Sequence, residues 1–348
     1  MVGVDADEVM RCPASVALLE ALEAEQRTDV SWFSALTTAD ASAVEQAAAA
    51  TAALTWGELV KCLVSAAERI GGPWQPEALP HLALAFQLAP ARRPIADAIA
   101  AHFAAAPREI DLGAQEWWLT DSSNRVLRPA FCRSHYVYCC GEFTWNGIWT
   151  VTSPPPEVHD DLIDVWEMFP GPVSRWRVPI QTNARVFEVN RPTDWARLVT
   201  EFPLQASRPH GGWELPGPNQ PRDEARQLEL VSAGLAVRTR AEVFMPDWAA
   251  VADAFDGVHL SWIGKLTCDG RVIDLPQLGE HAVSIVRYWG SERTLWLNDV
   301  FGTPSPLVAP ALTGRINGDT GIDAGESRRL RVDTDSIAAL LGRDPFSR

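Results

Sequence analysis

Four potential metal ligands lie close together in the sequence, at Cys132, His135, Cys139 and Cys140. Cysteine sulfur and histidine nitrogen are common zinc ligands, and four of them would complete a tetrahedral site. However, segment 135–140 is expected to be a strand, in which successive side chains point to opposite faces. Cys139 and Cys140 would then lie on different faces, as would Cys132 and His135, so one ion could not bind all four. We therefore predict buried, unreactive cysteines and no metal site.

A second set of polar residues is spread along the chain in a fixed order. Arg133 precedes an expected strand, and the strand at 147–153 ends in the hydroxyls of Thr152 and Ser153. Far downstream, Glu292 is a lone carboxylate between two aromatic-flanked segments. Whether these residues can act together depends on the elements that carry them.

Residues 1–108 are predicted to be helical. Ser42 and Glu45 have capping-box spacing, as do Thr55 and Glu58, so one helix is expected to begin near each pair. The region is rich in alanine and poor in β-branched residues, which favours helix. Its first fifty residues contain nine acids and two arginines, a local charge of −7. We interpret the region as a small helical bundle with a solvated acidic face rather than a dock for one basic partner.

From residue 109 onward, short runs in which apolar and polar residues alternate are broken by proline and glycine, as is typical of strands. Strands are expected at 135–140, 147–152, 185–189, 242–245, 258–263, 282–289 and 294–300. The predicted fold class is therefore α+β, with a helical N-terminal domain at 1–108 and an α+β domain at 109–348.

A strand followed by a short helix is expected twice in the second region. Asp194 and Asp247 are each placed as a helix N-cap, where a carboxylate accepts hydrogen bonds from unpaired first-turn amides. Trp195 and Trp248 follow directly and begin apolar stripes at helical spacing. We therefore expect both indole rings to be buried against a sheet.

Composition and charge exclude several classes of function. The chain has 348 residues and a net charge of −15, which argues against a nucleic-acid backbone or an anionic membrane as its main partner. Its acidic N-terminus does not resemble a secretory signal, and its longest uncharged apolar stretch is far shorter than the ~20 residues of a membrane helix. Six cysteines in so long a chain do not indicate a disulfide framework. We expect a cytoplasmic protein with reduced thiols.

The order of Arg133, Thr152–Ser153 and Glu292 resembles the ADP-ribosyltransferase fold of the Arg/Ser-Thr-Ser/Glu type, over about residues 110–305. The sequence is also similar to a group of actinobacterial and phage-associated proteins, through the segments at 147–150, 256–260 and 289–296. The first resemblance implies a mixed, split sheet and NAD as the substrate. The implied activity is that of an ADP-ribosyltransferase or NAD glycohydrolase, in a toxin-like or regulatory protein, without a metal.

The resemblance also implies a role for each site residue. Arg133 would bind the NAD pyrophosphate, since a guanidinium offers bidentate donors. Glu292 would be catalytic: it would bind the ribose and stabilise the cation that forms as nicotinamide leaves. Thr152 and Ser153 would hold the strand that shapes the nicotinamide pocket. The other implied cofactor-binding residues are Trp149, Thr150 and Trp289, of which either tryptophan could stack on the nicotinamide ring.

Departures from the family pattern leave alternatives open. The Ser-Thr-Ser motif is Val-Thr-Ser at 151–153, and Gly290 stands where many members have an acceptor-selecting Glu or Gln. Transfer of ADP-ribose to arginine is therefore not expected. Three alternatives remain: NAD hydrolysis, transfer to another acceptor, or an inactive member of the fold. Arg125 or Arg128 could replace Arg133. We expect Glu292 to share one cleft with the hydroxyls and at least one of these arginines.

A different class of function is a non-enzymatic interaction protein of the immunity or adaptor type. The acidic N-terminal region would then bind a basic protein partner, and Glu292 would be a solvated residue at a strand turn. The acidic net charge favours this alternative, whereas the ordered arginine, hydroxyls and carboxylate favour the enzyme.

Overall fold

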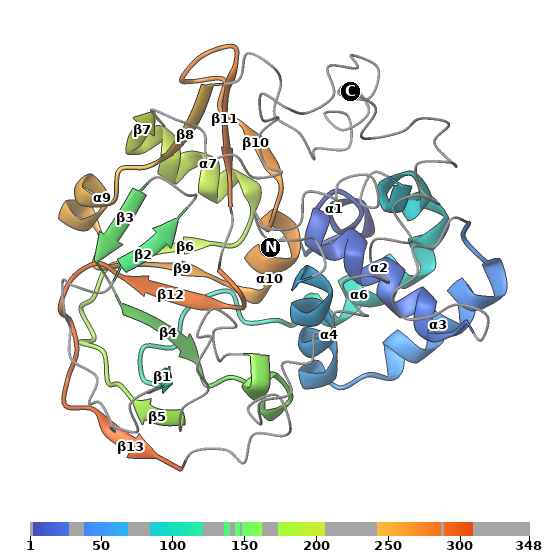
Figure 1. The fold of residues 1–348 in the computed structure, drawn as a ribbon, viewed down its shortest axis with the longest axis horizontal. Coiled ribbons are helices and arrows are strands. Elements are labelled where there is room, and N and C mark those ends of the chain that lie inside the picture. Colours follow the sequence, from blue (N-terminus) through green and yellow to red (C-terminus); the bar gives the residue numbers. More distant parts are fainter. Residues whose placement is uncertain are drawn as a thin grey trace, which may run out of the picture.

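The computed structural model describes residues 3–27, 38–68, 84–120, 136–139, 143–146, 148–161, 173–205, 242–286 and 289–308. Within these ranges the chain combines helices with three sheets, which confirms the predicted α+β class. The N-terminal helices lie together on one side of the molecule and the sheets on the other (Figure 1).

Every regular element that the structure describes before residue 109 is a helix. These elements are α1 (Ala6–Val9), α2 (Pro13–Glu25), α3 (Ala41–Ala53), α4 (Trp56–Glu68), the 3-10 helix η1 (Ala89–Arg92) and α6 (Arg93–Phe103). The capping box at α4 is confirmed, because the Glu58 amide donates to Thr55 Oγ1 and the Thr55 amide donates to Glu58 Oε2. Helix α3 begins near Ser42, as predicted, but its N-cap is Asp40, whose carboxylate accepts from the amide of Ala43.

A seven-stranded sheet forms the centre of the second region, in the order β13-β5-β1-β4-β12-β9-β6. Its strands are β1 (Gln115–Thr120), β4 (Ile148–Thr152), β5 (Val173–Arg177), β6 (Val186–Val189), β9 (Gly257–Leu260), β12 (Arg293–Trp296) and β13 (Ser305–Leu307). All neighbouring pairs are antiparallel except β6 and β9, which run parallel. Strands distant in sequence, such as β4 and β12, therefore lie side by side.

Two smaller sheets accompany it. One has the order β10-β11-β8-β7, formed by β7 (Pro203–Gln205), β8 (Glu242–Pro246), β10 (Val272–Asp274) and β11 (Ala282–Ile285). The other is the hairpin of β2 (Tyr136–Cys139) and β3 (Phe143–Asn146).

The two expected strand-then-helix units are present as β6 with α7 (Pro192–Glu201) and β8 with α9 (Trp248–Ala254). Trp195 and Trp248 are both buried in the core beneath the central sheet, as predicted. Asp247 caps α9 by accepting from two first-turn amides, which is also as predicted. Asp194 is not an N-cap: α7 begins earlier, at Pro192, and the Asp194 carboxylate reaches back to two preceding amides.

The expected strand at 258–263 is wrong in its second half. It ends at Leu260 because Ser261 begins a new helix, α10 (Trp262–Cys268), by accepting from the amide of Gly264 at 3.0 Å. A Cβ atom at Gly264 would lie 2.2 Å from the carbonyl oxygen of Val189, so only glycine lets the helix pack this closely on β6.

Helix α10 joins the two regions of the chain. Its side chains Trp262, Ile263 and Leu266 belong to the same apolar core as the helices α1 to α6. The 3-10 helix η2 (Pro156–Asp161) adds Val158 to that core. The helical region and the sheet region are therefore packed through one shared core. Among the described residues, no helix has the length and apolar character needed to cross a membrane.

Candidate functional site

Five polar residues form a continuous row on one face of the seven-stranded sheet. They are Gln115, Thr152, Glu292, His259 and Glu188, each on or next to one of the adjacent strands β1, β4, β12, β9 and β6. Gln115 is paired with Thr152, and His259 with Glu188, and paired residues on neighbouring strands point to the same face. We call these five residues the polar row.

Glu292 lies at the centre of the polar row and is held by three hydrogen bonds. Thr152 donates twice, from Oγ1 to Oε1 at 2.7 Å and from its backbone amide to Oε2 at 3.1 Å. His259 Nε2 lies 2.8 Å from Oε1. Thr152 Oγ1 in turn accepts from Gln115 Nε2 at 2.9 Å. Because the Glu292 side chain is only 4% exposed, its carboxylate is fixed in position and largely shielded from water.

His259 is a buried histidine between two carboxylates. Its Nδ1 lies 2.5 Å from Glu188 Oε2, and its Nε2 contacts Glu292. Burial is the largest influence on its pKa and lowers it, but the hydrogen bonds and charges of Glu188 and Glu292 outweigh burial and raise the pKa to about 9. At neutral pH the ring is therefore protonated and donates to both carboxylates, so that the three groups together carry one negative charge.

The raised pKa of His259 makes the stability of the fold depend on pH. The pKa rises from 6.5 to about 9 on folding, so the stabilisation is complete below the lower value and is lost as the pH rises through the upper one. We expect the free energy of unfolding to fall by about 3 kcal/mol across this window, as measured by urea unfolding at a series of pH values. His259→Leu, which lacks the titrating ring, should give a flatter profile. Parallel profiles for the parent and the variant would contradict the expectation.

Thr150 and Ser153, on either side of Thr152, do not contact Glu292. Thr150 is buried, and its Oγ1 donates to Gln115 Oε1 at 2.5 Å and accepts from Trp296 Nε1 at 2.7 Å. Ser153 is exposed and has a φ of 34°, in the left-handed region that few residues other than glycine adopt. Its hydroxyl donates to the carbonyl oxygen of Ala114, away from Glu292. Of the expected hydroxyls, the structure brings only Thr152 to the carboxylate.

Trp149 and Trp289 lie on the opposite face of the sheet from Glu292. Because side chains alternate along β4, Trp149 points away from the face that carries Thr152. Its ring packs edge-on against Trp289, with ring centroids 4.8 Å apart, in the same core as Trp195. The structure therefore places both rings on the face away from Glu292, Trp289 fully buried and Trp149 partly buried.

Several expected site residues lie outside the described residues. These are Arg133, Arg128 and Arg125, together with Cys132, His135 and Cys140 of the rejected metal cluster. Cys139 lies on β2, but its side chain is not described. In the part of the chain that the structure describes, no group of three or more histidine, cysteine or acidic side chains is arranged to hold a metal ion.

Sequence reasoning missed three members of the polar row: Glu188, His259 and Gln115. A signal was present for the first two, because each is a charged or titratable residue inside a short, otherwise apolar strand. Such residues are rarely buried without a partner. Their pairing was not readable, however, because Glu188 and His259 are 71 residues apart and meet only through the parallel pairing of β6 and β9.

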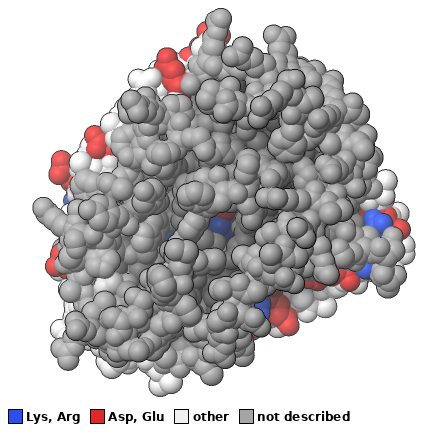
Figure 2. Space-filling model, viewed as in Figure 1, with Lys and Arg blue, Asp and Glu red and all other residues white. Residues whose placement is uncertain are grey.

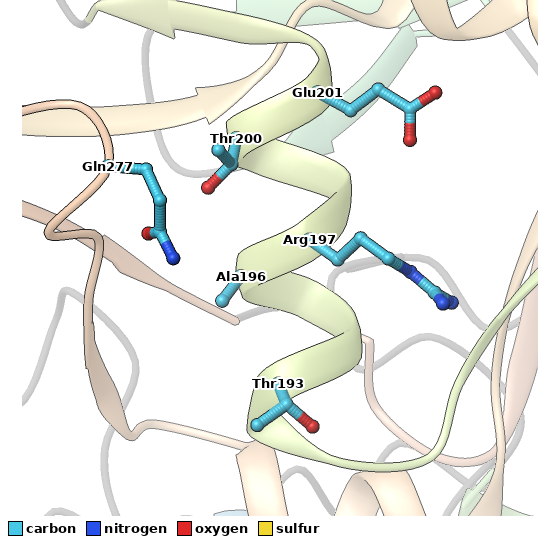
Figure 3. Close-up of a pocket in the computed structure, with 6 residues that line it drawn as sticks. All are labelled: Thr193, Ala196, Arg197, Thr200, Glu201 and Gln277. Carbon is cyan, nitrogen blue, oxygen red and sulfur yellow. The ribbon is translucent and has the colours of Figure 1, made fainter.

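A groove of about 390 Å³ lies between α7 and Gln277, apart from the polar row. Figure 3 shows Thr200 and Ala196 facing Gln277 across this groove, whereas Arg197 and Glu201 point to the other side of the helix. The Arg197 guanidinium instead lies 4.8 Å from the ring centroid of Phe187. The groove shares no residue with the polar row, so it is not the place where Glu292 would meet a substrate.

Comparison with known proteins adds no relative from which a function could be transferred. The chain matches no protein-family model, no curated protein and no solved structure. A fixed, shielded carboxylate in a group of net negative charge can stabilise a neighbouring cation more strongly than water does.

Proposed function

We propose that the chain acts on NAD at Glu292, releasing nicotinamide and passing ADP-ribose to water or to an acceptor. The observation that supports this proposal is the contact between Thr152 at the end of β4 and Glu292, which directly precedes β12. These residues are 140 positions apart in sequence. An ADP-ribosyltransferase-like site would need a hydroxyl-bearing strand beside a lone carboxylate, and this pair supplies both groups.

The proposed reaction uses Glu292 for electrostatic stabilisation. The bond between the ribose carbon and the nicotinamide nitrogen breaks, and its electron pair leaves with nicotinamide, which becomes neutral. Positive charge then develops on the ribose, where a preorganised carboxylate stabilises it. An oxygen of water or of the acceptor forms the new bond to the same carbon and releases its proton. Arg133 is the proposed pyrophosphate-binding residue.

Glu188 has a supporting part in this proposal. The imidazolium of His259 offsets one of the two carboxylate charges, and without Glu188 the buried group would be neutral. With both carboxylates, the group keeps a negative charge beside the developing cation. Glu188 is 23% exposed, so solvent screens its charge more than that of Glu292.

The proposal is tested with Glu292→Gln, which keeps the size of the side chain and removes its charge. We expect nicotinamide release to fall by about 100-fold or more, because the charge acts on the transition state. The affinity for NAD should change by only a few-fold. Nicotinamide release is followed by chromatography and NAD binding by titration calorimetry.

The matched control is Glu280→Gln, which removes an exposed carboxylate at a position outside the polar row. This variant should release nicotinamide at the parent rate. Equal rates in Glu292→Gln and the parent would exclude the catalytic assignment. A parent chain that binds no NAD would exclude the whole proposal.

A second candidate function is a non-enzymatic binding protein, in which Glu292 is a buried structural residue and not the solvated strand-turn residue that this interpretation expected. A shielded carboxylate with three donors also serves to join β4, β12 and β9 without any substrate. Asp and Glu side chains lie at several separate places around the edge of the face shown in Figure 2. NAD titration separates the two candidates, since only the first has an NAD site.

A further inference from the structure

A cluster of three charged residues and one tryptophan lies near the edge of the central sheet, on the other face of the sheet from Gln115. It consists of Glu116 and Trp118 on β1 and of Arg175 and Arg177 on β5. Glu116 is paired with Arg177 and Trp118 with Arg175, so the four side chains share one face. We call these four residues the arginine cluster. It contains none of the residues of the polar row.

The carboxylate of Glu116 is the anchor of the arginine cluster. Arg175 binds it with two parallel hydrogen bonds, from Nε at 2.6 Å and from Nη2 at 2.8 Å. Arg177 donates from Nη2 at 3.1 Å, and Trp118 from Nε1 at 3.3 Å. Glu116 is buried, and each of its oxygens accepts two of these bonds. The carboxylate therefore has little capacity for a further donor.

The arginine cluster has more positive charge than its own carboxylate can balance. Two guanidinium groups share the single carboxylate of Glu116, although one arginine would neutralise it. This surplus of positive charge is found in a chain whose net charge is −15. The side chains of Arg175 and Arg177 are 21% and 33% exposed, so water and small solutes can reach them.

Both guanidinium groups are held in place and keep donors that no described residue uses. The Arg175 guanidinium lies 5.1 Å from the ring centroid of Trp118, which adds a cation–π contact to its two bonds with Glu116. Its Nη1 makes no hydrogen bond to a described residue. Arg177 Nη1 makes only a long bond of 3.3 Å to the carbonyl oxygen of Gly113. Arginines that are already ordered lose little conformational entropy when they bind a ligand.

We propose that Arg175 and Arg177 form a binding site for a phosphate group. Planar guanidinium groups match the oxygen geometry of phosphate, and two of them can bind separate oxygens of one anion. Glu116 sets their orientation while leaving one positive charge for the ligand. Because the arginine cluster lies on the opposite face from Glu292, this site is independent of the proposed NAD chemistry.

The test is titration calorimetry of the full chain with inorganic phosphate and, separately, with glycerol phosphate, at constant ionic strength. We expect saturable binding of one phosphate group per chain. Tighter binding of glycerol phosphate would identify a phosphate ester as the ligand, and tighter binding of inorganic phosphate would identify the free ion. Arg177→Gln should weaken binding about tenfold or more, since it removes a charged hydrogen-bond donor.

Two further variants test whether binding depends on the guanidinium group of Arg177 in particular. Arg177→Lys keeps the charge but not the planar fork, and should bind several-fold more weakly than the parent. Arg185→Gln removes an arginine that is 58% exposed and pairs with Asp256 elsewhere, and should bind as the parent does. Arg175 still neutralises Glu116 in both Arg177 variants, so both should keep the parent melting temperature. Heats that never saturate, or equal affinity in the parent and both Arg177 variants, would overturn the proposal.

Discussion

Replacing His259 with leucine is expected to lower the free energy of unfolding by about 3–5 kcal/mol at neutral pH. The imidazolium is the charge partner of two carboxylates, at 2.5 Å from Glu188 and 2.8 Å from Glu292. Leucine fills a similar volume but leaves the two carboxylates without a positive partner. The loss is large because one of them, Glu292, is buried. Urea unfolding of the parent and the variant measures the difference.

The effect of His259→Leu should depend on the carboxylates that it leaves behind. Adding Glu188→Gln and Glu292→Gln to the leucine variant removes both charges, so stability should be partly recovered rather than lost further. His281→Leu is the matched control, because the Nδ1 of His281 has no hydrogen-bond partner among the described residues. That replacement should change the free energy of unfolding little. Losses that simply add in the triple variant would contradict the charge-pairing explanation.

Replacing Trp195 with alanine is expected to cost about 3–5 kcal/mol of unfolding free energy, as for other truncations of core aromatic residues. Trp195 is among the largest fully buried side chains, and its ring packs against Trp248 with centroids 6.4 Å apart. Its Nε1 also donates to the buried Ser284 Oγ at 2.8 Å. Thermal or urea unfolding measures the loss.

Replacement by phenylalanine separates packing from the hydrogen bond. Trp195→Phe leaves Ser284 Oγ buried without its donor, which costs about 1–3 kcal/mol. Trp248→Phe is the matched control, because Trp248 is also buried but its Nε1 has no hydrogen-bond partner in the part of the chain that the structure describes. The first variant should therefore lose more stability than the second. A larger loss for Trp248→Phe would show that ring volume, not hydrogen bonding, determines the cost.

Local patterns predicted much of the fold where the decisive interaction is itself local. The Thr55 and Glu58 box and the Asp247 cap each depend on residues within three positions, and the structure contains both. Near Ser42 the helix begins about where it was expected, but Asp40, two residues earlier, is the residue that caps it. The helix α10 was missed because an apolar run after a strand looks like more strand, until Ser261 is recognised as a cap.

The candidate site was predictable only in part. The order of motifs pointed to Thr152 and Glu292, which lie in contact, whereas Trp149 and Trp289 were placed with them although they pack on the other face. Side chains alternate between the two faces of a sheet along β4, so Trp149 and Thr152 could have been assigned to opposite faces from the sequence alone. No local pattern could have brought His259 to the carboxylates, because that contact depends on the order of strands in the sheet.

The core shared with α10 has a consequence for the nascent chain. The helices α1 to α6 leave the ribosome before α10, but part of their apolar surface is covered by its residues Trp262, Ile263 and Leu266. Contacts that join residues so far apart in sequence form late, because a long loop must close first. During synthesis these helices therefore expose an uncovered apolar face, which is the kind of surface that chaperones bind. Packing of the first hundred residues is completed only after α10 has been translated.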